Sequence, residues 1–362
     1  MKKAKIAIVA EWLTSKGGGE KVVDELISIF PEAQIFTTVF NPKIFPELII
    51  KKPITSFLQN IPALNKRHQL LGPLMPKAIE SLNLSGYDII ISSSSAFGKG
   101  IIKPKGAVHI CYCHTPMRYA WQPDVDRRLS RLPFSSPIIG GLRKWDLKSN
   151  SSIDYFVTNS HYTAQRIKKY YNREAIVIYP PVTVTKQANK PEKGDYYFAI
   201  SRFVGYKRFD LAIRACEDLG RKLIVAGEGP EEKSWQLLAK DNTTFVGRVD
   251  DTEKDALIAG AKALIFPAEE DFGIVPIEAM ALATPVIGYK KGGTTETVID
   301  GQTGVLFEKQ SVDSLKESIL KFEKMTFSKD ALIQRANQFS KEKFDEKIKK
   351  LVDNIKKENQ WT

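Results

Sequence analysis

The sequence has few cysteines and no long apolar run. Only three cysteines occur among 362 residues, and Cys111 and Cys113 are too close together for a usual zinc site. We therefore expect reduced core thiols, as in a cytosolic protein. The apolar run from Lys5 to Ala10 is too short for a signal peptide or a membrane span, and no other stretch approaches the roughly 18 apolar residues that a spanning helix needs. We expect a cytoplasmic protein that is either soluble or attached to a membrane only peripherally.

The first half of the chain is short of acidic residues. Residues 1–183 contain 25 Lys and Arg against 13 Asp and Glu, whereas residues 184–362 contain 29 of each. A one-sided positive field attracts a polyanion, either an anionic membrane surface or a nucleic acid. Because no nucleic-acid-binding motif accompanies the charge, we expect contact with the inner face of the cell membrane and no nucleic-acid partner.

Short apolar segments alternate with stretches of helical spacing along the first half. After the strand from Lys5 to Ala10 come a glycine turn at 17–19 and a helical pattern from Glu20 to Phe30. Further strand signals follow at four places, which are Tyr87–Ile91, Ala107–Tyr112, Tyr155–Thr158 and Ala175–Ile178. This alternation predicts a parallel, doubly wound sheet.

A second alternating series follows a linker that contains Pro180 and Pro181. Its predicted strands are Tyr196–Ile200, Lys222–Ala226, Thr244–Val246, Ala263–Phe266 and Pro285–Gly288. The fold class predicted is α/β, with two Rossmann-like domains, 1–183 and 184–340, that face a ligand-binding cleft. The charged final helix, within 341–362, is predicted to cross back to the first domain.

The stretch from Lys51 to Leu74 breaks the alternation, because it mixes apolar and basic residues. Such a mixture can lie in a bilayer interface, and it is equally typical of amphipathic helices packed on a sheet. The sequence leaves both interpretations open.

The most informative segment runs from Phe266 to Ala281. A buried strand ends, a loop with Gly273 follows, and Pro276 stands where a helix can begin, so the helix dipole would favour a diphosphate. Glu270 and Glu278 stand eight residues apart, and each carboxylate can accept two hydrogen bonds from a vicinal diol.

This segment resembles the E-x7-E motif of the family 4 glycosyltransferases, which have the GT-B fold. The resemblance implies that Glu270 holds the transferred sugar and Glu278 the ribose. It also implies that the backbone of Phe272, Gly273 and Ile274 contacts sugar and phosphate oxygens.

Three further motifs of the second domain fit a diphosphate site. Arg202 and Lys207 follow a strand and can converge on a diphosphate, whereas Arg208 is expected at the surface. Gly227 follows the next strand, where a small residue permits close approach of a base or ribose. Gly292 and Gly293 are similar to the family's Gly-Gly loop, which faces the leaving phosphate.

In the first domain, the glycine loop is not the G-x-G-x-x-G dinucleotide fingerprint, which argues against a dehydrogenase. By the resemblance, Gly17 and Gly18 approach the donor diphosphate closely. The segment from Cys111 to Trp121 resembles the C-H-T-P-M-R-Y stretch of a bacterial O-antigen mannosyltransferase (WbaZ-like) subgroup, in which the matching His points at the transferred sugar. The resemblance implies this role for His114. Arg118 and Tyr119 are expected in the cleft.

The predicted function is a retaining, metal-independent hexosyltransferase. GDP-mannose is the donor that the resemblance favours, a UDP-hexose is the alternative, and the acceptor expected is a lipid-linked saccharide of surface polysaccharide synthesis. No cofactor is expected. Asp124 and Asp126 form a D-x-D, but in a loop that does not suit a metal site. A nucleotide-sugar epimerase and a non-catalytic sugar-nucleotide-binding subunit are the alternatives from other classes.

Overall fold

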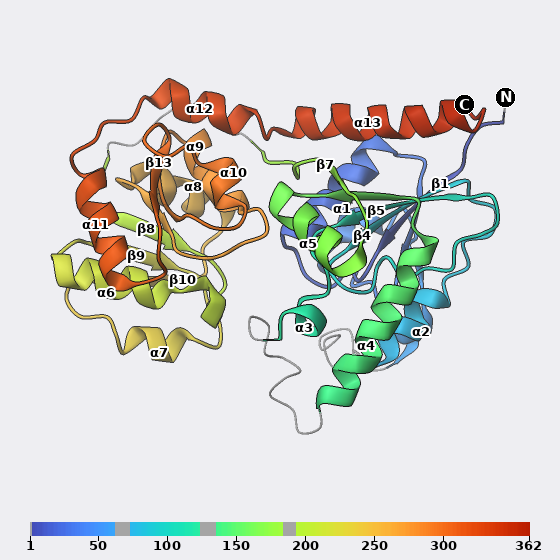
Figure 1. The fold of residues 1–362 in the computed structure, drawn as a ribbon, viewed down its shortest axis with the longest axis horizontal. Helices are drawn as coiled ribbons and strands as arrows, with labels where there is room; N and C mark the ends of the chain where they lie inside the picture. The colour runs from blue at the N-terminus through green and yellow to red at the C-terminus, as the bar shows by residue number, and fades with distance from the viewer. Residues whose placement is uncertain (1, 62–72, 124–134, 184–192) are drawn as a thin grey trace. The chain divides into compact units, whose positions relative to one another are not determined.

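The computed structural model describes residues 2–61, 73–123, 135–183 and 193–362 (Figure 1). The chain divides into two compact units. The first contains Met1–Pro181 and Phe344–Thr362, and the second contains Val182–Lys343. Each unit is built on its own parallel sheet with flanking helices, which confirms the predicted fold class of two Rossmann-like α/β sheets.

The first unit has a seven-stranded sheet in the order β3-β2-β1-β4-β5-β6-β7. Its strands are β1 (Ile6–Ala10), β2 (Gln34–Thr37), β3 (Ile54–Thr55), β4 (Ile89–Ser94), β5 (Val108–Cys113), β6 (Tyr155–Thr158) and β7 (Ile176–Val177). The helices are α1 (Gly18–Ile29), α2 (Met75–Glu80), α3 (Arg118–Trp121), α4 (Ser135–Ser149), α5 (His161–Tyr171) and α13 (Lys341–Glu358), with 3-10 turns η1 (Pro46–Leu48), η2 (Phe57–Asn60) and η5 (Asn150–Ser152).

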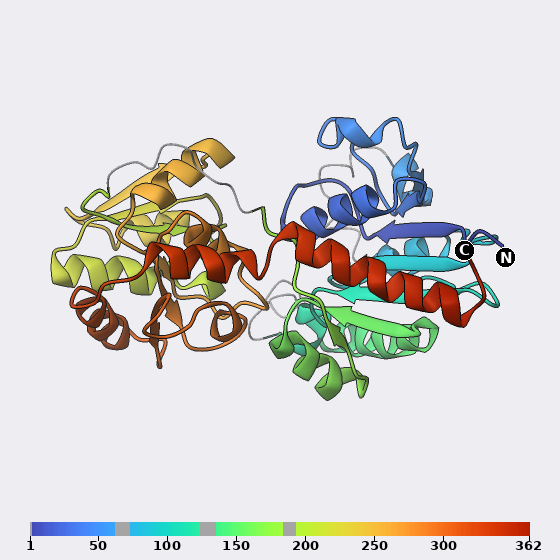
Figure 2. The same ribbon diagram turned by 90° about the horizontal axis from the view of Figure 1, so that it is seen from above.

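Both faces of the first sheet are covered, which explains why its central strands are apolar without alternation. On β1, Ile8 and Ala10 join one apolar cluster, whereas Ala7 and Val9 join another. The first cluster also contains one side of α13, whose buried residues are Phe344, Ile348, Val352 and Ile355. Their spacing of three and four places them on one face of the helix. Figure 2 shows this C-terminal helix, in red, lying over the strands of the first unit.

The second unit has a six-stranded sheet in the order β10-β9-β8-β11-β12-β13. Its strands are β8 (Tyr197–Ile200), β9 (Leu223–Ala226), β10 (Thr243–Gly247), β11 (Leu264–Phe266), β12 (Val286–Tyr289) and β13 (Gly304–Phe307). The helices are α6 (Phe209–Leu219), α7 (Glu232–Gln236), α8 (Asp251–Gly260), α9 (Ile274–Ala281), α10 (Thr294–Thr297), α11 (Val312–Phe322) and α12 (Lys329–Asn337), and η6 is Gly205–Lys207.

The predicted strands match observed strands to within a few residues, but three observed strands lie where no strand is predicted. These are β2, β3 and β13. Within the 51–74 stretch, residues 51–61 contain no α-helix, which differs from the helical interpretation. Residues 51–61 form the short strand β3 and the turn η2, because the Ile54–Thr55 backbone pairs with β2. Residues 62–72 lie outside the described part of the chain.

Lys99 and His109 are among the charged or titratable side chains that are buried in the first unit. The Lys99 ammonium lies 2.9 Å from the Asp146 carboxylate and donates to Asn150 Oδ1, also at 2.9 Å. The imidazole of His109 lies between the Ser92 hydroxyl, at 2.7 Å from Nε2, and the Ser152 carbonyl, at 3.2 Å from Nδ1. Each buried group therefore has polar partners, as the cost of desolvation requires.

Burial makes the stability of this unit sensitive to acid. It lowers the pKa of His109 to about 3, although the Ser152 carbonyl and Asp154 act in the opposite direction. In the unfolded chain this histidine titrates near pH 6.5. Below pH 6.5 the unfolded state binds a proton at this histidine, whereas the folded state does not. Each further decrease of one pH unit therefore lowers the free energy of unfolding by about 1.4 kcal/mol, until the pH reaches the folded-state pKa.

We predict that His109→Gln removes this acid sensitivity. At pH 7.5 the variant should be less stable than wild type, because it loses the hydrogen bonds of His109. The difference in the free energy of unfolding between the two proteins should decrease steadily as the pH falls from 6.5 to 4.5. Urea unfolding of both proteins across this range measures the gap. A gap that stays constant with pH would contradict the prediction.

Candidate functional site

The carboxyl edge of the second sheet gathers the residues predicted to bind the donor. Because the strands are parallel, the loops that follow β8, β9, β11 and β12 emerge at the same edge. The second-unit residues predicted from the sequence all lie in these loops or in α9, and they are Arg202, Lys207, Gly227, Glu270, Phe272, Gly273, Ile274, Glu278, Gly292 and Gly293.

Two of these loops are joined backbone to backbone. Glu270 forms an isolated parallel bridge with Gly292, and the Gly293 N–H donates to the Glu270 carbonyl at 2.8 Å. A Cβ atom at Gly293 would lie 2.3 Å from the Cα of Phe272. Gly292 has a φ of +75°, a conformation that favours glycine. The Gly-Gly pair is therefore required by the close contact with the Glu270 loop.

Gly227 is required by a second close contact. A Cβ atom there would lie 1.9 Å from the carbonyl oxygen of Ser201, so the loop after β9 rests directly on the loop after β8. The sequence interpretation assigns this small residue to the approach of a base or ribose. In the structure, the group that approaches Gly227 closely is the backbone of the neighbouring loop, which leads into Arg202.

The carboxylates of the E-x7-E motif both face lysines. The Lys207 ammonium, in η6, contacts the Glu270 carboxylate directly. Glu278 lies on α9, and its Oε2 is 3.4 Å from the Nζ of Lys254 on α8. Arg202 is exposed just beyond the end of β8. Arg208, expected at the surface, adopts a left-handed conformation and pairs with Asp210 at 3.0 Å.

The helix α9 begins at the site. Its N-cap is Gly273, with a φ of +83°, and no side chain caps the helix. The helix starts at Ile274, two residues before the proline that the sequence places at its beginning. Phe272, just before the cap, packs against Phe339 with ring centroids 5.7 Å apart. The amino end of an otherwise apolar helix thus lies beside the loop that carries Glu270.

In the first unit, His114 and Gly19 line one small pocket of about 90 Å³, and the predicted Gly17 and Gly18 directly precede Gly19. His114 Nε2 lies 2.8 Å from the Ser93 hydroxyl, and a Cβ atom on Gly19 would lie 3.6 Å from the same nitrogen. Gly17 is the N-cap of α1, and Gly18 is its first residue. The predicted residues of this unit are therefore neighbours at the carboxyl edge of its sheet.

Two carboxylates that the sequence interpretation does not single out also line this pocket, Glu11 and Glu20. Glu11 is buried, and its Oε1 accepts hydrogen bonds from the Ser95 and Gly98 backbone N–H groups at 2.8 and 3.0 Å. Burial nevertheless raises the pKa of Glu11. Burial also raises the pKa of Glu20 to about 7, with Glu11 and Asp24 adding repulsion. The position of Glu11 directly after a buried strand is the only signal in the sequence.

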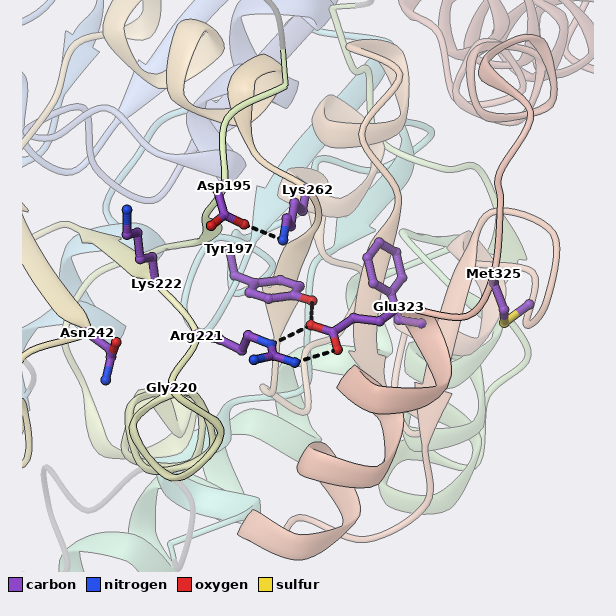
Figure 3. A pocket seen from close by; sticks show the side chains of 10 residues that line it. Asp195, Tyr197, Gly220, Arg221, Lys222, Asn242, Lys262, Glu323 and Met325 are labelled. Atoms are coloured by element: carbon purple, nitrogen blue, oxygen red, sulfur yellow. Dashed lines mark hydrogen bonds and ion pairs between the residues drawn. The ribbon is translucent and has the colours of Figure 1, made fainter.

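A larger pocket of about 490 Å³ lies at the opposite, amino edge of the second sheet, and it contains none of the predicted residues. Figure 3 shows its ion pairs: Arg221 donates to both carboxylate oxygens of Glu323, at 2.7 and 3.0 Å, and Lys262 pairs with Asp195. The Tyr197 hydroxyl also donates to Glu323, at 3.1 Å. Since ligands of such sheets bind outside the carboxyl ends of the strands, size alone does not make this pocket the site.

The remaining predictions meet the structure as follows. Cys111, Cys113 and Cys216 are buried free thiols. Asp124 and Asp126 lie outside the described residues. Within the described ranges, His, Cys, Asp and Glu side chains form no group of three or more suited to a metal ion. No described helix has both the length and the apolar content needed to span a bilayer.

Comparison with protein families gives two matches that together cover most of the chain. Residues 16–186 match the model described as "Glycosyltransferase Family 4", and residues 183–339 match "Glycosyl transferases group 1".

Relatives and solved structures agree with these matches. An uncharacterized glycosyltransferase of Methanocaldococcus jannaschii is 29% identical over 67% of this chain and 73% of its own length. An alpha-1,3/1,6-mannosyltransferase of Schizosaccharomyces pombe is 30% identical over 54% of this chain, which is 47% of that enzyme. Among solved structures, Anabaena HepE in complex with UDP has a TM-score of 0.69 at 17% identity and covers 97% of this chain and 100% of its own. Sucrose-phosphate synthase of Thermosynechococcus elongatus has a TM-score of 0.72, also at 17% identity, and covers 98% of this chain and 99% of its own.

The contact between the two loops predicts the effect of a single methyl group. Gly293→Ala places a Cβ where the Phe272 backbone lies, so the two loops must separate. We expect a clearly lowered melting temperature and weaker binding of GDP and UDP, measured by thermal denaturation and calorimetry. Gly140→Ala is the control, because a Cβ atom in that helix meets nothing within 4 Å. Equal behaviour of the two variants would contradict the argument.

Proposed function

Because the chain belongs to the family 4, group 1 glycosyltransferases of GT-B fold, we propose that it transfers a hexose from a nucleotide diphosphate sugar with retention of configuration and without a metal ion. One observation carries the proposal: the two cations, the two glutamates of the E-x7-E motif and the Gly-Gly loop lie at one edge of one sheet.

In this proposal, the second unit binds the donor. Arg202 and Lys207 take the diphosphate and neutralise the charge that grows as it leaves, assisted by the amino end of α9. Glu270 binds the transferred sugar and Glu278 the ribose, with the backbone of Phe272, Gly273 and Ile274 beside the sugar and phosphate. Gly227 lies beside the base or ribose, and Gly292 and Gly293 face the leaving phosphate.

The first unit supplies the remaining groups. His114 contacts the transferred sugar, and Gly17 and Gly18 bring the glycine loop close to the diphosphate. The acceptor hydroxyl forms a bond to the anomeric carbon on the face that the diphosphate leaves. Its proton passes to the departing phosphate oxygen, so no covalent enzyme intermediate is required.

The donor favoured is GDP-mannose. Similarity to the alpha-1,3/1,6-mannosyltransferases of Schizosaccharomyces pombe and Homo sapiens, at 30% and 28% identity, supports mannose. A UDP-hexose is the alternative, because solved structures of similar fold contain UDP or UDP-glucose. The acceptor proposed is a lipid-linked saccharide of O-antigen or capsule type, in line with the O-antigen subgroup resemblance. Calorimetry with GDP-mannose and UDP-hexoses separates the two donors.

We also propose peripheral contact with an anionic membrane through the first unit. Exposed apolar side chains gather beside Lys51 and Lys52, and they are Ile49, Ile50, Ile54 and Phe57. Together with the net positive charge of residues 1–183, this combination fits an anionic lipid surface.

We predict that Arg202→Ala and Lys207→Ala each lower turnover by about 100-fold. Each substitution would remove a cation whose interaction with the diphosphate strengthens as the diphosphate departs. Sugar transfer or donor hydrolysis measures the rate. Lys222→Ala is the control, because this exposed lysine lies at the opposite edge of the same sheet, and it should retain wild-type turnover. Near-normal rates in Arg202→Ala and Lys207→Ala would refute the diphosphate assignment.

The membrane contact predicts a second pair of outcomes. Ile50→Asp should weaken pelleting with anionic vesicles at low salt by about tenfold, because a side chain able to enter the interface becomes charged. Leu237→Asp is a matched control in the second unit, since Leu237 is 86% exposed and Ile50 is 88% exposed. Wild-type protein that does not pellet, or equal loss in both variants, would exclude this surface.

A further inference from the structure

Lys254 lies beneath Glu278 as part of a small charge cluster in the second unit. Its Nζ is 3.4 Å from Glu278 Oε2, 3.0 Å from Asp251 Oδ1 and 3.7 Å from Asp255 Oδ1. The side chains of Lys254 and Glu278 are only 14% and 11% exposed. The lysine comes from α8 and the glutamate from α9, so the pair joins two helices of the same unit.

The environment of Glu278 explains why it needs a cation. It is the only charged residue of α9, whose residues from Pro276 to Ala281 are all buried. A carboxylate in such a helix carries a large desolvation cost unless a cation offsets it. Burial alone lowers the pKa of Lys254, but the attraction of Glu278, Asp251 and Asp255 outweighs burial and raises it. The ammonium is therefore charged throughout the neutral range.

We propose that Lys254 is a positioning residue, which holds the Glu278 carboxylate in the orientation that accepts hydrogen bonds from the ribose diol of the donor. This inference rests on the proposed function, in which Glu278 binds ribose. A carboxylate that accepts hydrogen bonds from two adjacent hydroxyl groups must turn its plane toward the diol. Fixing a flexible side chain in that orientation on binding has an entropic cost. An ammonium on one carboxylate oxygen fixes the plane before the nucleotide arrives.

The test compares nucleotides with and without the diol. The probes are GDP and UDP, each against its 2′,3′-dideoxy counterpart, and calorimetry measures the affinity ratio within each pair. Because hydrogen bonds to a charged acceptor contribute strongly to binding, wild type should bind the ribose form of its nucleotide about tenfold or more tightly than the dideoxy form. Glu278→Gln should largely abolish this preference, and Lys254→Met should reduce it to about threefold or less.

Three variants separate positioning from general destabilisation. Lys254→Arg keeps the cation and should keep most of the preference. Lys254→Gln is neutral but polar, and it replaces Lys254→Met if thermal denaturation shows that the latter does not fold. Asp251→Asn changes an exposed partner of the same lysine without touching Glu278, so its ratio should match wild type.

The outcomes distinguish this inference from the function on which it rests. If wild-type protein binds neither GDP nor UDP, or binds ribose and dideoxy forms equally, the proposed function or its ribose assignment fails. If Glu278→Gln loses the preference but Lys254→Met and Lys254→Gln keep it, only the inference fails. Equal weakening of ribose and dideoxy forms in the lysine variants would also overturn it, because that result indicates a merely structural role.

Discussion

The carboxyl edge of the second sheet depends on the backbone contact between the loop after β11 and the loop after β12. The Glu270–Gly292 bridge and the hydrogen bond from Gly293 fix the position of Glu270 before any side chain is considered. Phe272, on the same loop, then packs against Phe339, and α9 begins at the following glycine. A catalytic arrangement carried by loops needs such rigid support, because small displacements of reacting groups reduce rates strongly.

A consequence of this support is that the charges at the edge already have partners. Lys207 contacts Glu270, Lys254 lies by Glu278, and Lys291 is 3.1 Å from Glu269. A nucleotide sugar that used Lys207 and Glu270 would exchange one set of partners for another. Its net affinity would then be a difference between large terms, which favours recognition through geometry over recognition through total charge.

The sequence predicts the central strands well because their residues are apolar on both faces, a signal that needs no knowledge of the fold. It does not predict β3, whose two residues become a strand only by pairing with Phe36 and Thr37. The motifs predict loops that the structure brings to one edge of the second sheet, because glycines and strand ends are local features. The sequence does not single out Lys254 or Glu11. Each is identified only by a partner that is distant in the sequence and that the tertiary fold brings close.

The serine-rich stretch of the first unit, Ser92–Ser95, has a physical explanation in the structure. Ser94, Ser95 and Gly98 surround the buried Glu11 carboxylate with donors, and a Cβ atom at Gly98 would lie 2.9 Å from the Glu11 Cγ. The next residue, Lys99, forms an ion pair with Asp146 instead. The buried carboxyl group of Glu11 and the buried ammonium of Lys99 thus each have their own polar partners. Burying charged groups costs stability compared with an apolar core. The burial of Glu11 in the pocket that His114 also lines therefore favours a role of Glu11 in holding the shape of that pocket.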